Sequence, residues 1–308
     1  MNKTGIEIPK YEVKKVLSAL SETIDWGIQL MNIPSWWKET QGEGIRLGIC
    51  DTGSGETHPD LKEAINWAQN FSASNTYLDI DGHGSFTQGI LGARCNQIGI
   101  IGVAPKSELY SLKVLNDDGK GEFEYLTKAI EWALANNLDI INCSLGGSGN
   151  IDDYPDLKNV IEQAYKQGIC IVAASGNENK ISNLPSLYPQ VLAIAALDKN
   201  KNKAGFSNYG KIDFSAPGVN IYSTYKDGGY CCLSGTSFAS PLIASFIALL
   251  LSKHLTKPNS KTPIREGELR VPDIIEHLKR FAIDLGASGK DTYFGWGMVR
   301  FKEIENET

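Results

Sequence analysis

Residues 138–174 read LDIINCSLGGSGNIDDYPDLKNVIEQAYKQGICIVAA, with an apolar run at each end of a helical pattern. Leu138–Cys143 and Ile169–Ala174 have the length and composition of buried strands. Between them, Asp156–Gln167 has the pattern of a helix that stops at Gly168. A strand, a helix and a second strand in this order form a βαβ unit with parallel strands. This stretch therefore predicts a parallel sheet.

The same alternation continues on both sides of this stretch. Further strands are expected at Ile45–Cys50, Leu109–Leu115 and Val191–Leu197, and helices at Phe123–Asn137, Thr236–His254 and Val271–Ala282. Strands that are apolar along nearly their whole length are buried on both sides. We therefore expect an α/β fold whose mainly parallel central sheet is covered by helices on both faces. Residues 1–22 are expected to be an N-terminal extension, with a short helix at 11–20, and residues 23–308 a single domain.

Composition excludes several classes of protein. The 308 residues are 42% hydrophobic and 21% charged, with a net charge of −6. Because no basic stripe is present, we expect no nucleic-acid partner. The N-terminus has no apolar stretch of signal-peptide length, and the longest apolar run, Phe246–Leu251, is too short to span a bilayer. Six cysteines without a CxxC spacing favour a reducing compartment. We expect a cytoplasmic protein without a membrane partner.

Three short motifs carry the candidate chemistry: GICDTG at 48–53, DGHGS at 81–85 and SGTSFASP at 234–241. A serine that attacks an amide needs a base, and the base needs a carboxylate to hold its tautomer. Asp51 follows a predicted strand, and His83 lies between two glycines. Ser237 begins a predicted helix, where N–H groups and the helix dipole favour an anion. Each motif alone is also typical of a turn or a helix cap, but together and in this order they predict an Asp-His-Ser triad.

At this point the sequence resembles the subtilase family, from about Trp26 to Gly297. The resemblance includes the three motifs above and four others, Gly102–Pro105, Ser144–Gly147, Ala174–Asn177 and Ala216–Gly218. It implies a three-layer subtilisin-like fold and a serine endopeptidase that forms an acyl-enzyme with protein or peptide substrates. By similarity Ser237 is the nucleophile, His83 the general base and acid, and Asp51 the orienting carboxylate. Asn177 is similar to the side-chain donor of the oxyanion hole.

The resemblance also implies a substrate strand. Ser144, Leu145, Gly146 and Gly147 resemble the family's edge strand, which pairs with an extended substrate. Glu178 follows Asn177, at the rim of the pocket for the residue before the cleaved bond. It either favours a basic residue there or is a solvated carboxylate.

A structural Ca²⁺ ion is implied in the same way. The matching ligands are the side chains of Asp60 and Asn96 and the carbonyl oxygens of Arg94, Ile98 and Ile100. Oxygen ligands of this kind suit a hard cation. Glu22 aligns loosely as a further carboxylate.

The layout is closest to intracellular subtilisins, which have a short inhibitory N-terminal extension with a Leu-Ile-Pro-Tyr-like segment. Here Ile6–Tyr11 reads IEIPKY, with one extra residue before the tyrosine. We hypothesise that residues 1 to about 20 lie across the active cleft until they are trimmed, and that Pro9 resists cleavage there. The resemblance also admits a homodimer.

The sequence departs from the family pattern at two places, and three alternative functions remain open. Ser85–Gly89 replaces the family's Thr-His-Val-Ala-Gly, and Leu242 replaces a histidine. A binding protein with the same fold and no activity is one alternative. Asp51–Ser54 spells an aspartic-protease signature, but only once. An α/β-hydrolase would use Ser144 with a later Asp and His254 or His277, but the first glycine of its GxSxG motif is missing here.

Overall fold

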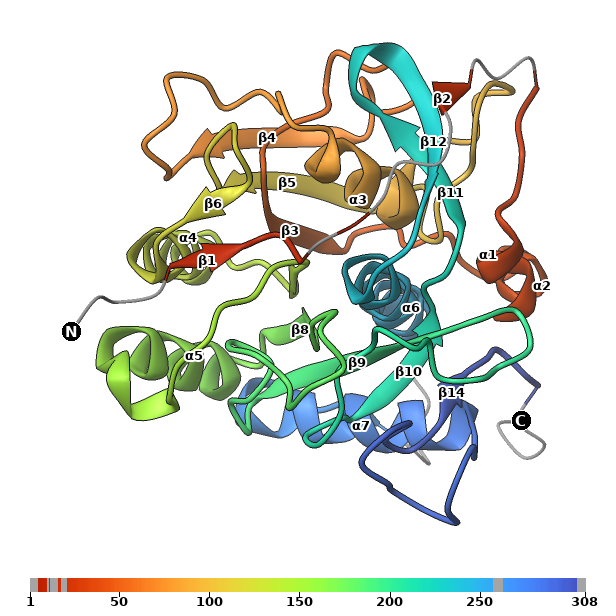
Figure 1. Cartoon of the computed structure of the whole chain (residues 1–308). Coiled ribbons are helices and arrows are strands. Elements are labelled where there is room, and N and C mark those ends of the chain that lie inside the picture. The colour runs from red at the N-terminus through yellow and green to blue at the C-terminus, as the bar shows by residue number, and fades with distance from the viewer. Residues whose placement is uncertain (1–4, 10, 12–15, 18–20, 257–262, 304–308) are drawn as a thin grey trace.

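A nine-stranded sheet forms the centre of the fold in the computed structural model, which describes residues 5–9, 11, 16–17, 21–256 and 263–303 (Figure 1). All neighbouring strands in it are parallel except the pair at one edge, Ala282–Ile283 and Met298–Val299, which is antiparallel. In spatial order the strands are β13 (Ala282–Ile283), β14 (Met298–Val299), β10 (Phe214–Pro217), β9 (Val191–Leu197), β8 (Cys170–Ala174), β7 (Ile140–Cys143), β3 (Arg46–Asp51), β5 (Glu108–Lys113) and β4 (Ile65–Asn70).

Helices and two small sheets complete the described part of the chain. The helices are α1 (Trp26–Leu30), α2 (Ile33–Trp36), α3 (His83–Gly92), α4 (Phe123–Ala135), α5 (Pro155–Gln167), α6 (Thr236–Thr256) and α7 (Arg270–Phe281), with 3₁₀ turns η1 (Ile151–Asp153), η2 (Lys226–Gly228) and η3 (Gly267–Leu269). One small sheet joins β11 (Ile221–Tyr225), β12 (Gly229–Leu233) and β2 (Val16–Leu17), and the other joins β1 (Ile6–Glu7) and β6 (Lys120–Gly121).

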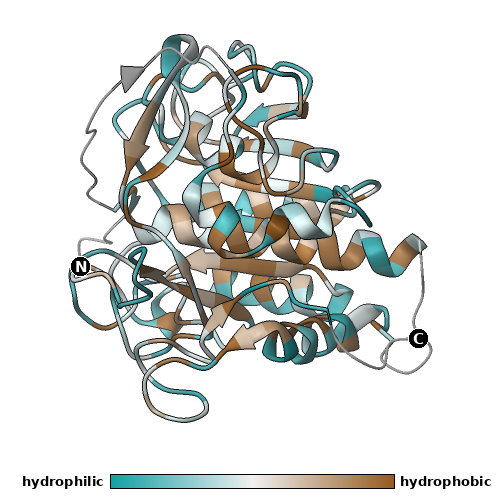
Figure 2. Ribbon diagram, turned by 90° about the vertical axis from the view of Figure 1, so that its right-hand side faces the viewer, coloured by the Kyte–Doolittle hydropathy of each residue, from teal (hydrophilic) through white to brown (hydrophobic). Residues whose placement is uncertain are grey.

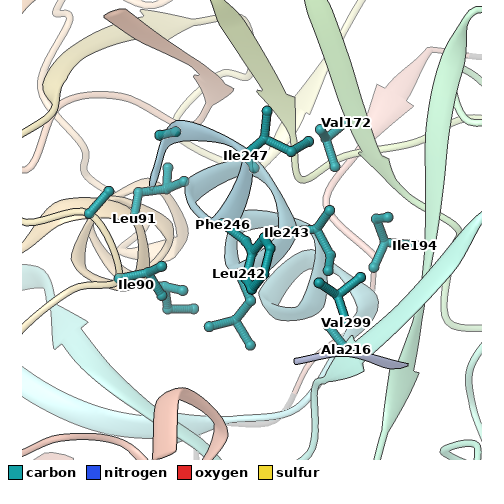
Figure 3. Close-up of a cluster of buried hydrophobic side chains, with 14 of the residues drawn as sticks. Ile90, Leu91, Val172, Ile194, Ala216, Leu242, Ile243, Phe246, Ile247 and Val299 are labelled. Carbon is teal, nitrogen blue, oxygen red and sulfur yellow. The ribbon is translucent and has the colours of Figure 1, made fainter. Parts of the chain in front are cut away.

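Alternating side chains of the central strands fill two separate cores. Leu47 and Ile49 on β3 belong to the core around α6, whereas Cys50 belongs to the core around α4 and α5. Successive side chains of a strand point to opposite faces, so the helices cover both faces of the sheet. Ribbon colouring shows that the hydrophobic residues concentrate in the central strands and α6 (Figure 2). In the first core, Ile243 and Phe246 of α6 lie among side chains of α3 and the sheet (Figure 3). The predicted fold class is confirmed.

Helix α6 is long and apolar enough to cross a membrane by length and composition, but 83% of its most apolar window is buried inside the fold. Its apolar surface is therefore accounted for by the core that it fills.

The predicted helix at 11–20 is wrong where the structure describes it. Val16 and Leu17 form strand β2, which pairs with Tyr230 and Cys231 of β12. Pairing with the open edge of β12 satisfies the backbone hydrogen-bonding groups of these two residues, whereas an isolated helix of this length is only marginally stable. The other residues of that prediction, apart from Tyr11, lie outside the described residues.

The sheet register gathers the sequence motifs at one edge. Asp51, the last residue of β3, is level with Lys113 of β5, and Cys50 is level with Cys143 of β7. Ser144 therefore leaves β7 beside Asp51, and β8 ends at Ala174 next to β7. Loops beyond the carboxyl ends of parallel strands are where such folds place their chemistry.

Candidate active site

Asp51 and His83 form a buried hydrogen bond. Asp51 Oδ1 lies 2.7 Å from His83 Nδ1, and the two side chains are 1% and 0% exposed. The N–H of Thr52 also donates to Asp51 Oδ1 at 2.7 Å. Among the described residues, His83 Nε2 and Asp51 Oδ2 are buried without a hydrogen-bond partner. The carboxylate therefore binds one ring nitrogen and leaves Nε2 for another group.

A second carboxylate, Asp79, ties the Asp51 loop to the start of α3. Its Oδ1 accepts the hydroxyl of Thr52 at 2.8 Å and the N–H of Gly82 at 2.9 Å. Its Oδ2 accepts the N–H and hydroxyl of Ser85 at 2.6 and 2.7 Å. Gly82 has a φ of 108°, a left-handed value that favours glycine, and His83 begins the helix directly after it. The glycine and Asp79 together hold His83 against Asp51.

The electrostatic surroundings of His83 favour its charged form. Burial alone would lower the pKa of His83, but the charge of Asp51 and its hydrogen bond, followed by Asp81 and Asp79, raise that pKa above the ordinary value.

Ser237 is the second residue of α6 and is 1% exposed. Its hydroxyl donates to the carbonyl oxygen of Ser144 at 3.1 Å, and the hydroxyl of Ser144 donates to the carbonyl oxygen of Ser237 at 2.7 Å. The ring of Phe238, the next residue, lies with its centroid 5.4 Å from that of His83. The structure thus brings the start of α6 to the predicted substrate strand and brings Phe238 to the ring of His83.

Thr236 fixes the orientation of the Asn177 amide. Asn177 Oδ1 accepts the N–H of Thr236 at 2.9 Å and its hydroxyl at 2.8 Å. Because the oxygen is held by Thr236, the Nδ2 group faces the opposite way and lies near Gly235, where an added methyl group would come within 3.0 Å of it. A donor at this place suits an oxyanion formed at Ser237.

The first described residues lie between two antiparallel neighbours. We call Gly5–Pro9 the strap. On one side its residues Ile6 and Glu7 pair with β6 as β1, and on the other Glu7 exchanges both backbone hydrogen bonds with Gly146, at 2.9 and 3.0 Å (Figure 1). The N–H of Ile8 donates to the carbonyl oxygen of Gly119 at 3.0 Å. The strap is thus bound as an added β-strand.

The substrate strand predicted at Ser144–Gly147 pairs along one edge with the strap and along the other with the segment that contains Leu184. Leu145 is fully buried, and Gly147 exchanges backbone hydrogen bonds with Leu184. A cavity of about 370 Å³ opens beside it, lined by Gly5, Glu7, Pro9, Gly146, Gly147, Ser148, Glu178, Lys180 and Asn183. Glu178 Oε2 accepts the side-chain amides of Asn183 and Asn208 at 3.2 and 2.9 Å. Both interpretations of Glu178 remain predictions.

Two contacts of the site were not expected from the sequence. The hydroxyl of Tyr11 donates to Asp81 Oδ1 at 2.9 Å, and the Tyr11 ring lies with its centroid 5.4 Å from that of His83. The strand β6, which pairs with the strap, was also missed. Its only sequence signal is the Asp-Gly-Lys-Gly turn at 118–121, which is too short to show strand periodicity.

The predicted cation ligands also lie together. Asp60 Oδ2 accepts the N–H of Ile100 at 2.9 Å and the hydroxyl of Tyr230 at 3.0 Å, whereas Asp60 Oδ1 is buried without a partner among the described residues. Burial raises the pKa of Asp60, and its hydrogen bonds offset part of that effect.

The loop around these ligands is tied to Glu22 and to the core. Asn96 Oδ1 accepts the N–H of Ile98 at 3.1 Å, and Glu22 Oε1 accepts the N–H groups of Asn96 and Gln97 at 2.9 and 3.1 Å. The guanidinium of Arg94 donates to carbonyl oxygens of the core, including those of Glu63 and Ser107. In the described part of the chain, no backbone hydrogen bond ends on the carbonyl oxygens of Arg94, Ile98 or Ile100.

Comparisons with known proteins agree with this geometry. The model of the subtilase family, peptidase S8, matches residues 42–297. Subtilisin DY of Bacillus licheniformis is 37% identical over 91% of this chain and 97% of its own length, and subtilisin of Bacillus pumilus is 34% identical over 91% of this chain and 98% of its own. The minor extracellular protease Epr of Bacillus subtilis is 36% identical over 94% of this chain, which covers 43% of that protein. The chain belongs to the subtilase family and is a subtilisin-like serine endopeptidase.

Proposed function

We propose that this chain cleaves peptide bonds with Ser237 as nucleophile, His83 as general base and acid, and Asp51 as orienting carboxylate. The observation that carries the proposal is the buried 2.7 Å hydrogen bond between Asp51 and His83, beside the helix start that bears Ser237. The Ser237 hydroxyl binds the Ser144 carbonyl and His83 Nε2 has no partner among the described residues, so the reaction requires this hydroxyl to turn to Nε2. The oxyanion then forms beside the N-terminus of α6 and the Asn177 amide.

The reaction follows from these positions. Ser237 Oγ attacks the substrate carbonyl carbon while its proton passes to His83 Nε2. The tetrahedral intermediate collapses when His83 gives that proton to the leaving amine, which leaves an acyl-enzyme on Ser237. A water molecule, deprotonated by His83, repeats the attack and releases the second product.

We also propose that the N-terminal extension inhibits the enzyme. Glu7 lies opposite Gly146, so Pro9 lies opposite Ser144, whose carbonyl oxygen binds the Ser237 hydroxyl. The strap therefore follows the path of an extended substrate past the nucleophile. Pro9 is buried there and has no N–H, which makes it a poor residue at a bond to be cut. The ring of Tyr11 packs against the ring of His83, with the two centroids 5.4 Å apart.

A structural Ca²⁺ site at the 94–100 loop is the third part of the proposal. Asp60 Oδ1 is a buried oxygen without a partner among the described residues, and the nearby carbonyls of Arg94, Ile98 and Ile100 are of the kind that Ca²⁺ takes. Asp60 and Asn96 would supply the side-chain ligands. Bound there, the ion would neutralise Asp60 and fix the loop.

We also propose a cytoplasmic location. All six cysteines are free, including the exposed Cys95. Free thiols persist best in a reducing compartment.

The triad is tested by Ser237→Ala and Asn177→Ala. We expect Ser237→Ala to abolish labelling by a fluorophosphonate probe, because the activated hydroxyl is gone. Asn177→Ala should lower kcat by about 10²- to 10³-fold through loss of one oxyanion donor. Asn159→Ala, on the exposed face of α5, is the control and should keep full activity. Absence of labelling in both the wild type and an Ile6→Ser variant, in which the strap is weakened, would favour the alternative of a binding protein without activity.

The pH dependence of kcat/KM tests the environment of His83. Catalysis needs the neutral imidazole, which is present above the pKa of His83. Because the neighbouring carboxylates raise that pKa, the acid limb of the profile should lie above the ordinary histidine value of about 6.5. A limb at or below pH 6.5 would contradict the role of these carboxylates.

The strap is tested by Ile6→Ser in the full chain. Ile6 is 1% exposed, so its replacement removes roughly 2 kcal/mol of apolar burial and should raise the initial peptidase rate more than tenfold. Glu7→Ser is the matched control: its side chain is exposed and only its backbone pairs, so the rate should stay low. Intact mass, measured at the same time, excludes self-trimming. Equal rates in wild type and Ile6→Ser would reject inhibition by the strap.

Calcium binding is tested by thermal unfolding of the Ser237→Ala protein, which cannot cleave itself. Adding Ca²⁺ after chelation should raise Tm by several degrees, since a ligand that binds only the folded state stabilises it. The increase should vanish in Asp60→Asn and persist in Asp118→Asn, whose carboxylate is exposed. If Tm does not respond to Ca²⁺ in the parent protein, the loop holds no calcium.

A further inference from the structure

The strap shows where each residue of a bound peptide lies, and this inference rests on the proposed function of the site. Because Pro9 faces Ser144, the residue at its place precedes the bond to be cut. Ile8 marks the place of the residue before that one. The side chain of Ile8 lies against Gly119, since a methyl group on Gly119 would come within 2.7 Å of Ile8 Cδ1. From the same point Asp81 Oδ2 is 3.9 Å away. Ile8, Gly119 and Asp81 therefore border one small space.

Asp81 is held so that one of its oxygens faces this space. Its Oδ1 accepts the N–H of His83 at 3.1 Å and the hydroxyl of Tyr11 at 2.9 Å. For Oδ2, the described part of the chain records no hydrogen bond. The backbone contact with His83 is independent of the strap, so the carboxylate keeps its orientation when the strap leaves.

We propose that Asp81 makes this subsite selective for lysine or arginine at the second residue before the cleaved bond. A long basic side chain that follows the path of Ile8 past Gly119 brings its charged group to Asp81 Oδ2. A charge-assisted hydrogen bond forms there, beside the His83 helix start. An apolar residue at the same place fills the space and leaves Oδ2 to water.

Two comparisons support this assignment: one between a basic substrate residue and Ile8 of the strap, and one between the Ile8 subsite and the cavity beside Pro9. The strap carries Ile8 at this subsite, so it forgoes the ion pair and a basic substrate has an advantage over it. The cavity beside Pro9 also contains a carboxylate, Glu178, but its Oε2 is taken by Asn183 and Asn208, and Lys180 lines the same cavity. Selection of a basic residue is therefore stronger at the Ile8 subsite than at the Pro9 subsite.

The experiment is an internal competition between peptides in one reaction. The peptides follow the strap, Ile-Glu-Xaa-Ala before the cleaved bond, with lysine, norleucine or glutamate as Xaa. Competing substrates report the ratio of their kcat/KM values whatever fraction of enzyme the strap blocks, so the full chain is used, with Tyr11→Ala as a variant with a weakened strap. We expect lysine to exceed norleucine by about fivefold at low salt, with glutamate lowest, and the ratio to shrink at high salt.

Substitutions assign the effect to Asp81. In Asp81→Asn and Asp81→Ser, which both keep an acceptor for the His83 N–H, the ratio of lysine to norleucine should fall to near one. Asp118→Asn, an equal charge change in the exposed turn before Gly119, should keep the wild-type ratio. For peptides with lysine moved to the residue next to the cleaved bond, Asp81→Asn should leave the ratio unchanged.

The outcomes separate this inference from the proposed function. Hydrolysis without preference for lysine, or a preference that survives in Asp81→Asn, overturns the inference and leaves the peptidase intact. A preference lost equally in Asp118→Asn assigns it to the general charge of the cleft and also overturns the inference. No hydrolysis of any peptide by the wild type and the Tyr11→Ala protein overturns the proposed function and this inference with it.

Discussion

The buried carboxylate of Asp51 constrains the whole site. A charged oxygen without partners inside a protein is costly, so the chain must bring donors to it. Thr52 and His83 do so at Oδ1. Because β3 lies between β5 and β7, Asp51 cannot move to meet the imidazole, and α3 must begin where the carboxylate lies. The fully buried Lys113, level with Asp51, fixes the same turn through the carbonyl oxygen of Thr52.

The same backbone groups serve substrate and strap in the proposed function. Main-chain pairing with Gly146 and Gly119 binds an extended chain through its backbone and depends little on which side chains that chain carries. A segment of the same polypeptide is present at a high effective concentration, so modest contacts are enough to hold it there. The contacts of the strap are limited in this way: among its residues only Ile6 and Pro9 are buried, and Glu7 is exposed.

Sequence reasoning succeeded where one local property decides the structure. The run Val191–Leu197 is β9 to the residue, and Gly168, predicted as a stop, ends α5 with a φ of 82°. It failed where pairing with a distant segment decides. Residues 11–20 have the pattern of a short amphipathic helix, yet Val16 and Leu17 pair with the open edge of β12, and nothing in the sequence near residue 16 encodes that edge. The contact between Tyr11 and Asp81, 70 positions apart, is of the same kind. The sequence motifs were enough to predict Asp51, His83, Ser237 and Asn177 as site residues. The contacts by which Thr236 orients Asn177 are visible only in the structure.

The described residues of the N-terminal segment contact the cleft, β12 and the 94–100 loop, and this bears on where the proposed extension ends. Glu7 pairs within the cleft, Val16 and Leu17 with β12, and Glu22 and Thr23 with the 94–100 loop. The third attachment lies at the proposed calcium ligands, since the N–H of Thr23 donates to the carbonyl oxygen of Gly99 at 2.7 Å. Release of the strap from the cleft breaks only the first attachment. Glu22 thus shares its contacts with the folded domain, which supports placing the functional end of the extension before it, within the first 20 or so residues.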